Sequence, residues 1–105
     1  MSSENLKNPH LGEILKENFL KEFDMSQNAL AKEIAVPANR IHSIIRGQRR
    51  VTADTDLRLC RYFGLSEGYF LRLQIAYESM EAKRSLGRQL LQIHPYRGNE
   101  KRASA

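Results

Sequence analysis

Polar side chains recur along one side of the helix that the sequence predicts at about residues 37–46. At 3.6 residues per turn, Asn39, Ser43 and Arg46 cluster opposite three isoleucines at positions 41, 44 and 45. The isoleucines can pack while the polar groups face outward. An asparagine amide can pair with adenine and a guanidinium with guanine, each pair giving roughly 1–3 kcal/mol of discrimination. With flanking positions included, the predicted base-contacting residues are Ala38, Asn39, His42, Ser43 and Arg46.

Basic and polar residues flank that helix. Residues 26–50 carry five bases and one acid, a balance of +4, whereas residues 1–25 and 51–81 each carry −2. A basic segment alone is usually a solvated face, but beside a candidate recognition helix it is the pattern expected for binding a phosphate backbone. The start of the preceding helix and the loop that follows would flank the groove. The predicted phosphate-contacting residues are Gln27, Arg40, Arg49, Arg50 and Thr52.

The sequence contains no other recognisable site chemistry. His10, His42 and His94 are far apart, and no cysteine or carboxylate lies at metal-ligand spacing from them. There is no glycine-rich phosphate loop and no nucleophile elbow. The single Cys60 permits no intramolecular disulfide, and a core role is favoured over redox sensing. We therefore expect no catalytic residue, no metal and no cofactor.

Two short helices and a tight turn must position the polar face. Ser26 can cap the first helix, and apolar residues at positions 30, 31 and 34 share one side until that helix ends near residue 34. Pro37 lacks a backbone N–H, so it suits the first turn of a new helix. Two helices at a steep angle, the second with a polar outer face, form a helix-turn-helix, whose second helix can lie in the major groove of DNA.

Further helices are predicted to supply the core, which makes the fold class all-α, with five or six helices. Apolar residues recur at helical spacing over residues 11–23, with Phe19 and Phe23 as core anchors. Thr52 can cap a helix that runs to about residue 63 and stops at Gly64, and Ser66 can cap a fifth helix. The residues of the capped helix that should pack under the motif are Leu57, Leu59, Cys60 and Phe63.

Beyond about residue 77 the chain has more apolar residues than so small a core can bury. Exposed apolar ridges of this kind usually mark a protein interface. Gly87 weakens the last predicted helix by about 1 kcal/mol relative to alanine, so this helix is expected to order only on contact. The alternative is that the ridge folds back on its own domain. The predicted interface residues are Tyr77, Met80, Leu86, Leu90, Leu91 and Ile93.

A chain of 105 residues with 41% hydrophobic content supports one domain with a modest core. We divide it into a flexible N-terminal arm at residues 1–8, a helix-turn-helix domain at 9–81 and an extension at 82–105 that is partly helical and then disordered. No run approaches the roughly 20 apolar residues that span a bilayer, and the N-terminus lacks a secretion signal. We expect a cytoplasmic protein.

At residues 27–47 the chain resembles the DNA-binding motif of lambda-repressor-like and Cro-like regulators. Gln27 opens this motif and Gly47 ends it, while Ala35 stands at the turn position that usually holds glycine. A left-handed backbone there would cost an alanine roughly 1–2 kcal/mol. Over roughly residues 9–77 the resemblance is to HigA-type antitoxins, which are VapI-like proteins. It rests on His10, Gly12 to Leu15, Ser26 to Ala31, Val36-Pro37, Asn39 to Ile41, Thr52 to Thr55, Leu57 to Leu59 and Arg61 to Gly64.

Two residues depart from the HigA-type pattern, since Leu11 stands where the family often has proline and Asp56 where it often has alanine. The resemblance implies a dimer that binds operator DNA, represses its own operon and neutralises a small ribosome-dependent mRNA endonuclease encoded beside it. The C-terminal ridge would then serve dimerisation, which we favour, or toxin binding. Two alternatives are a stand-alone repressor without a toxin and a protein-interaction module whose basic helix docks an acidic partner.

Overall fold

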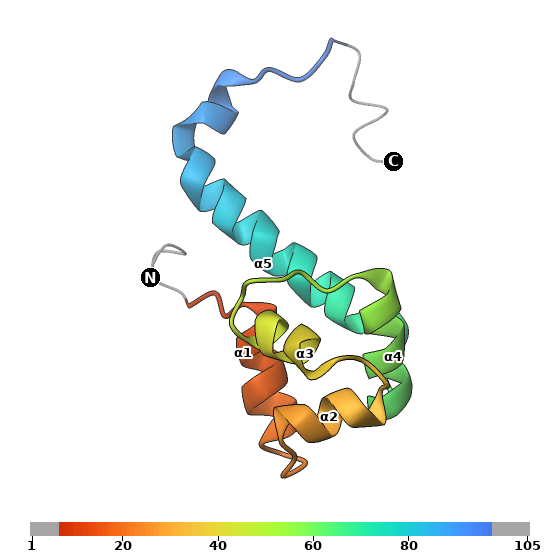
Figure 1. Ribbon diagram of the computed structural model, residues 1–105. Coiled ribbons are helices and arrows are strands. Elements are labelled where there is room, and N and C mark those ends of the chain that lie inside the picture. Colours follow the sequence, from red (N-terminus) through yellow and green to blue (C-terminus); the bar gives the residue numbers. More distant parts are fainter. Residues whose placement is uncertain (1–6, 98–105) are drawn as a thin grey trace.

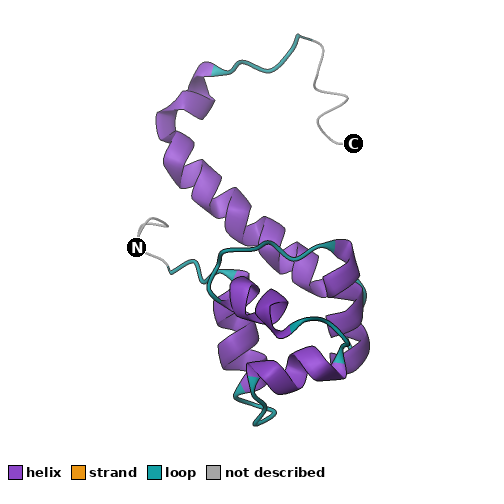
Figure 2. Ribbon diagram, viewed as in Figure 1, coloured by secondary structure: helices purple, strands orange, loops and turns teal. Residues whose placement is uncertain are grey.

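All regular elements in the described part of the chain, residues 7–97 of the computed structural model, are helices (Figure 1; Figure 2). The prediction of an all-α helix-turn-helix domain is confirmed. The short helix α1 continues directly into a π-helical stretch, η2, and the long helix α5 continues into a 3-10 helix, η3. The elements in order are α1 (Leu11–Ile14), η2 (Leu15–Leu20), α2 (Gln27–Glu33), α3 (Ala38–Ile45), α4 (Ala53–Phe63), α5 (Tyr69–Leu86) and η3 (Gly87–Gln92).

The first helix begins where the His10 side chain accepts a hydrogen bond from the backbone N–H of Gly12, with 3.0 Å between the nitrogens. Gly12 lies where α1 crosses α3. Any side chain on Gly12 would collide with the carbonyl oxygens of Ile44 and Ile45. The close approach of α1 to the end of the recognition helix therefore depends on this glycine.

The prediction that Phe23 anchors the core is wrong. Phe23 is 57% exposed, although its ring still contacts Phe63, and the residue that fills the core instead is Leu20. The reason is the π-helical stretch, in which the Lys21 N–H bonds to the carbonyl of Lys16, five residues back. The wider turn changes which later residues face inward. The other predicted anchor, Phe19, is half-buried and packs against the core.

The helix-turn-helix forms much as its local residues predict. The Ser26 hydroxyl accepts the N–H of Ala29 at 3.0 Å, and α2 ends at Glu33. Ala35 has a φ of +57°, so alanine does occupy the left-handed turn position. From α4, one guanidinium nitrogen of Arg58 donates to the carbonyl oxygens of Ile34 and Ala35, at 2.9 and 3.3 Å. These bonds hold the strained turn in place.

Helix α4 confirms both predicted caps but corrects its predicted core face. The Thr52 hydroxyl accepts the N–H of Thr55, and Gly64 ends the helix with a φ of +72°. Leu57 is 47% exposed, because the inward face consists of Thr55, Asp56, Leu59 and Cys60 and turns residue 57 outward. Cys60 is buried, and its burial raises the pKa of the thiol. This agrees with a core role.

The buried carboxylate of Asp56 joins α4 to the start of α5. It is 1% exposed and accepts backbone N–H bonds from Gly68 at 2.7 Å, Phe70 at 2.9 Å and Leu71 at 3.2 Å. The prediction that Ser66 caps this helix is therefore wrong. The helix begins at Tyr69, and the cap comes from a different helix.

The long helix α5 leaves the body of the domain. Its first half packs on α4 and α1, and its second half projects away and meets η3 at Gly87, where φ is +51° (Figure 1). The radius of gyration is 17.4 Å, against about 13 Å for a compact chain of 100 residues. The stretch predicted to form a separate last helix is thus divided: α5 continues to Leu86, and residues Gly87–Gln92 form the 3-10 helix η3.

The predicted N-terminal arm and C-terminal tail lie largely outside the described residues. Within those residues, Asn8 was assigned to the arm, but its side-chain amide donates to the carbonyl of Tyr77 at 3.1 Å and to Glu81 at 3.0 Å. The packed part of the chain therefore starts before the predicted boundary at residue 9.

The left-handed turn generates a first prediction. Ala35→Gly should raise the free energy of unfolding by about 0.5–1 kcal/mol, because relief of the left-handed strain exceeds the added flexibility of the unfolded chain. Urea denaturation followed by circular dichroism measures the change. Ala29→Gly, an exposed position inside α2, is the matched control and should lower stability by about 1 kcal/mol. Losses of stability in both variants would contradict the strain.

The buried carboxylate generates a second prediction. Asp56→Ala should lower the free energy of unfolding by about 2–4 kcal/mol, because three backbone N–H groups at the start of α5 lose their acceptor. Asp54→Ala, which removes an exposed carboxylate of the same helix, is the control and should cost about 1 kcal/mol or less. Equal losses in the two variants would show that Asp56 is not a structural cap.

Candidate nucleic-acid interface

The outward side of α3 carries the residues that were predicted to contact bases. Ile41 and Ile44 are buried at 0% and 2% exposure. On the other side of the helix, Asn39 and Arg46 are exposed and Ser43 is half-buried. The Asn39 amide and the Arg46 guanidinium are thus accessible to a ligand. Within residues 7–97, Arg46 forms no ion pair. Their contacts with bases remain a prediction.

The two flanking positions are less free. Ala38 is half-buried and packs against the core. His42 is also half-buried, and its Nε2 lies 3.0 Å from the Oδ1 of Asn28 on α2. Because an amide oxygen only accepts hydrogen bonds, Nε2 carries a proton in this arrangement. The tip of the imidazole is therefore directed to α2, and the remaining amide donors of Asn28 become candidates for a DNA contact.

An open hollow of about 850 Å³ lies beside this face, between the end of η2 and the two motif helices. Its lining includes His42 and Arg46 from α3, Gln27 from the start of α2, and Lys16 and Lys21 from the first helix. Sequence reasoning missed both lysines because they lie outside the basic segment 26–50. Lys21 forms an ion pair with Glu17 at 2.7 Å, and this contact lowers the pKa of the Glu17 carboxyl.

The predicted phosphate-contacting residues fall into two groups. Gln27, Arg49 and Thr52 lie at the ends of the motif, and Arg49 and Thr52 are exposed. Arg49 forms no ion pair within residues 7–97. Two of the guanidiniums, in contrast, already have carboxylate partners.

Arg40 and Arg50 are the paired guanidiniums. The Nη1 of Arg40 lies 3.3 Å from Asp54, a carboxylate that also accepts from Arg58 at 2.8 Å. Arg50 binds Glu78 of α5 through two nitrogens, at 2.7 and 2.9 Å. These hydrogen bonds lower the pKa of the Glu78 carboxyl and raise that of Arg50. No local sequence signal connects residues 28 positions apart, so this pair could not be foreseen.

The described part of the chain contains neither a candidate metal site nor a candidate membrane-spanning helix. Residues 7–97 contain no group of three or more histidine, cysteine or acidic side chains that could hold a metal ion. None of the helices there is long and apolar enough to cross a membrane.

The sequence of this chain is similar to those of known helix-turn-helix proteins. A helix-turn-helix family model matches residues 17–70. Virulence-associated protein I of Dichelobacter nodosus is 51% identical over 69 residues, which cover 66% of this chain and 64% of that protein. The chain thus spans a little less than two thirds of this relative. An uncharacterised HTH-type transcriptional regulator of Escherichia coli K12, YbaQ, is 28% identical over 75 residues, covering 71% of this chain and 66% of that protein.

Several solved structures of antitoxins are similar to this chain in fold and in sequence. The antitoxin HigA of Pseudomonas aeruginosa, in a structure with the higBA promoter, is 40% identical, with a TM-score of 0.77 over 85% of this chain and 98% of that one. An addiction module antidote protein of a HigA family from Coxiella burnetii is 40% identical, with a TM-score of 0.79 over 87% and 100%. The antitoxin GraA in complex with its operator is 29% identical, with a TM-score of 0.77 over 91% and 97%. The chain therefore belongs to the helix-turn-helix family, a class of DNA-binding proteins and not of enzymes, and within it to the HigA-type proteins.

Proposed function

We propose that this chain is a HigA-type antitoxin that binds operator DNA as a homodimer, represses its own operon and neutralises a cognate mRNA-endonuclease toxin. The observation that carries the DNA-binding part is the exposed polar face of α3, backed by buried isoleucines. It is supported by 40% identity to a HigA whose structure includes promoter DNA. A DNA-binding role places the chain in the cytoplasm.

In this proposal α3 lies in the major groove. Asn39, Ser43 and Arg46 contact base edges, while Ala38 and His42 lie at the margin of the contact. Phosphates are bound on both sides of the groove. The groups assigned to them are Gln27, Arg40, Arg49, Arg50 and Thr52.

The far end of α5 and η3 are assigned to the homodimer contact, with toxin binding as the alternative. Leu86 and Leu90 are 40% and 41% exposed, and Leu91 and Ile93 are 77% and 71% exposed, so the described chain leaves much of this ridge uncovered. Tyr77 and Met80, also predicted here, are half-buried, and the Tyr77 ring contacts His10. We therefore assign dimerisation chiefly to the ridge from Leu86 onward.

A stand-alone repressor is the second candidate function. It is supported by the similarity to YbaQ, an uncharacterised HTH-type transcriptional regulator. Copurification from the native source separates the two candidates, since only an antitoxin should bring a small basic protein with it. Salt-dependent binding to duplex DNA separates both from a protein-interaction module.

The role of α3 generates a third prediction. Asn39→Ala should weaken operator binding by roughly five- to a hundredfold and random duplex far less, because a bidentate base contact is worth about 1–3 kcal/mol. Arg49→Ala is the matched comparison, since loss of a phosphate contact should weaken both duplexes alike and lower the salt slope by about 0.9. Fluorescence anisotropy with the two duplexes measures both effects. An equal loss on operator and random DNA for Asn39→Ala would remove it from the base contacts.

The apolar ridge generates a fourth prediction. Leu91→Glu combined with Ile93→Glu should give a folded monomer with much weaker operator affinity, because a dimer places two recognition helices about 34–36 Å apart on one face of the DNA. Leu57→Glu, at an exposed apolar position of α4, should remain dimeric. Sedimentation and circular dichroism measure assembly and folding. A ridge variant that still sediments as a dimer and binds operator normally would leave the ridge to the toxin.

A further inference from the structure

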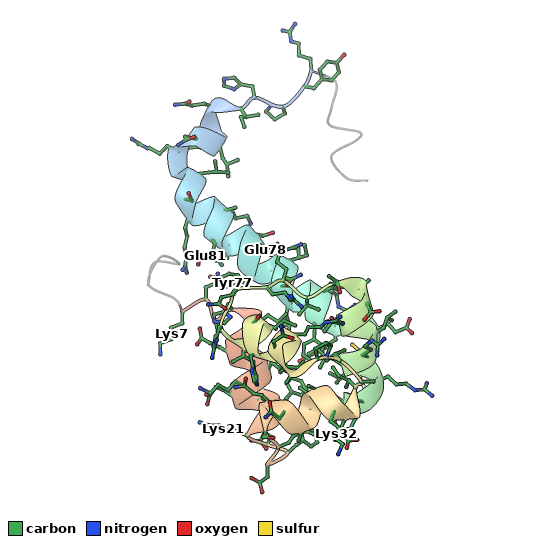
Figure 3. All side chains as sticks on the ribbon, in the orientation of Figure 1. Lys7, Lys21, Lys32, Tyr77, Glu78 and Glu81 are labelled. Atoms are coloured by element: carbon green, nitrogen blue, oxygen red, sulfur yellow. The ribbon has the colours of Figure 1, made fainter. Side chains whose placement is uncertain are left out.

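One side of α5 contacts the loop that leaves the recognition helix. Gln74, Glu78 and Glu81 recur at intervals of four and three residues, which places them on one face of the helix. Figure 3 shows Glu78 and Glu81 on the stretch of α5 that crosses this loop and the N-terminal segment. None of these three residues belongs to a DNA contact proposed above, but Glu78 contacts Arg50, which was assigned to a phosphate.

Gln74 sets the position of the exit loop relative to α5. Its side chain is buried at 6% exposure and pairs with both backbone groups of Val51, accepting from the N–H at 2.7 Å and donating to the carbonyl at 2.9 Å. Val51 itself is 2% exposed. Arg50, the residue immediately before this clamp, is therefore kept close to α5.

Arg50 meets Glu78 in the geometry in which an arginine binds a phosphate. Its Nε and Nη2 donate to the two carboxylate oxygens, at 2.7 and 2.9 Å, as a bidentate pair. A phosphate presents two oxygens to the same fork of donors. The side chains of Arg50 and Glu78 are 64% and 39% exposed, so solvent and an incoming anion can reach the pair.

We propose that the Glu78 carboxylate occupies the position on Arg50 that a DNA phosphate takes in the complex, so that Glu78 limits the affinity of the chain for DNA of any sequence. The inference rests on the proposed DNA-binding function. A phosphate must displace Glu78 from Arg50 or lie beside its negative charge, and both alternatives oppose binding. Arg49, one residue earlier, has no ion-pair partner within residues 7–97 and bears no comparable cost.

The alternative role for Glu78 is to hold Arg50 in the correct position for a phosphate. The two roles predict opposite changes in DNA affinity when Glu78 is neutralised. A competitor, when neutralised, frees a guanidinium, raises affinity and adds one phosphate contact to the salt dependence. A positioning residue, when neutralised, loosens the guanidinium and lowers affinity.

The test uses the full chain and compares Glu78→Gln with Glu81→Gln. Both remove one negative charge from α5, but within residues 7–97 Glu81 contacts Asn8 and Arg84, whereas Arg50 pairs with Glu78. Binding to a random 30-base-pair duplex is measured by anisotropy between 50 and 200 mM salt. Glu78→Gln should bind the duplex about two- to fivefold tighter than the wild type at low salt. Its plot of log affinity against log salt should be steeper by about 0.9, so that between 50 and 200 mM salt its affinity falls by roughly 3.5-fold more than that of the wild type. Glu81→Gln should change little.

Arg50→Gln alone and in combination with Glu78→Gln completes the cycle, and Glu78→Gln should give no gain in the Arg50→Gln background. Weaker binding by Glu78→Gln, no change, an equal gain in Glu81→Gln, or a gain that survives Arg50→Gln would each overturn the inference. If the wild-type chain binds neither operator nor random duplex, the proposed function falls as well. If the wild type binds and only Glu78→Gln departs from expectation, the proposed function stands without this inference.

Discussion

A single buried carboxylate determines how α5 joins the rest of this domain. Asp56 is almost fully enclosed and satisfies three backbone N–H groups where α5 begins. Of these groups, that of Phe70 is buried and those of Gly68 and Leu71 are partly buried. Leaving them without an acceptor would cost more free energy than an exposed ion pair contributes. The direction of α5 depends on this contact, and with it the approach of Gln74 to the exit loop. The recognition helix is thus oriented in part by a residue outside the helix-turn-helix.

Features that depend on neighbours in the sequence were predictable. Ser26 and Thr52 bind backbone groups three residues away, and Gly64 supplies a left-handed residue at a helix end, so each boundary follows from local chemistry. The outward face of α3 follows from periodicity alone, because three isoleucines define the buried side. The family resemblance located the left-handed turn at Ala35, and the backbone angle there agrees.

Features that depend on a departure from regular helix geometry, or on distant residues, could not be predicted. Apolar spacing identified the buried side of the first helix, but a π-helical turn placed Leu20 inward and left Phe23 outside. The cap of α5 comes from Asp56 in α4, whereas a linear scan finds the nearer Ser66. The same limit applies at the candidate site, where Asn28 meets His42 only because two helices cross. Which residues contact bases and which contact phosphates is still a prediction.

The second half of α5 has a consequence for how the chain unfolds. From residue 82 to residue 97 every side chain except that of Arg84 is exposed, so these turns share little packing with the core. Their hydrogen bonds can open while the domain stays folded, and their amide hydrogens should exchange with solvent much faster than those of α4. A bound partner would add its own binding free energy to this local stability. How long residues 82–97 stay in their folded conformation then depends on the partner that binds them, whereas the rest of the domain depends on its own core.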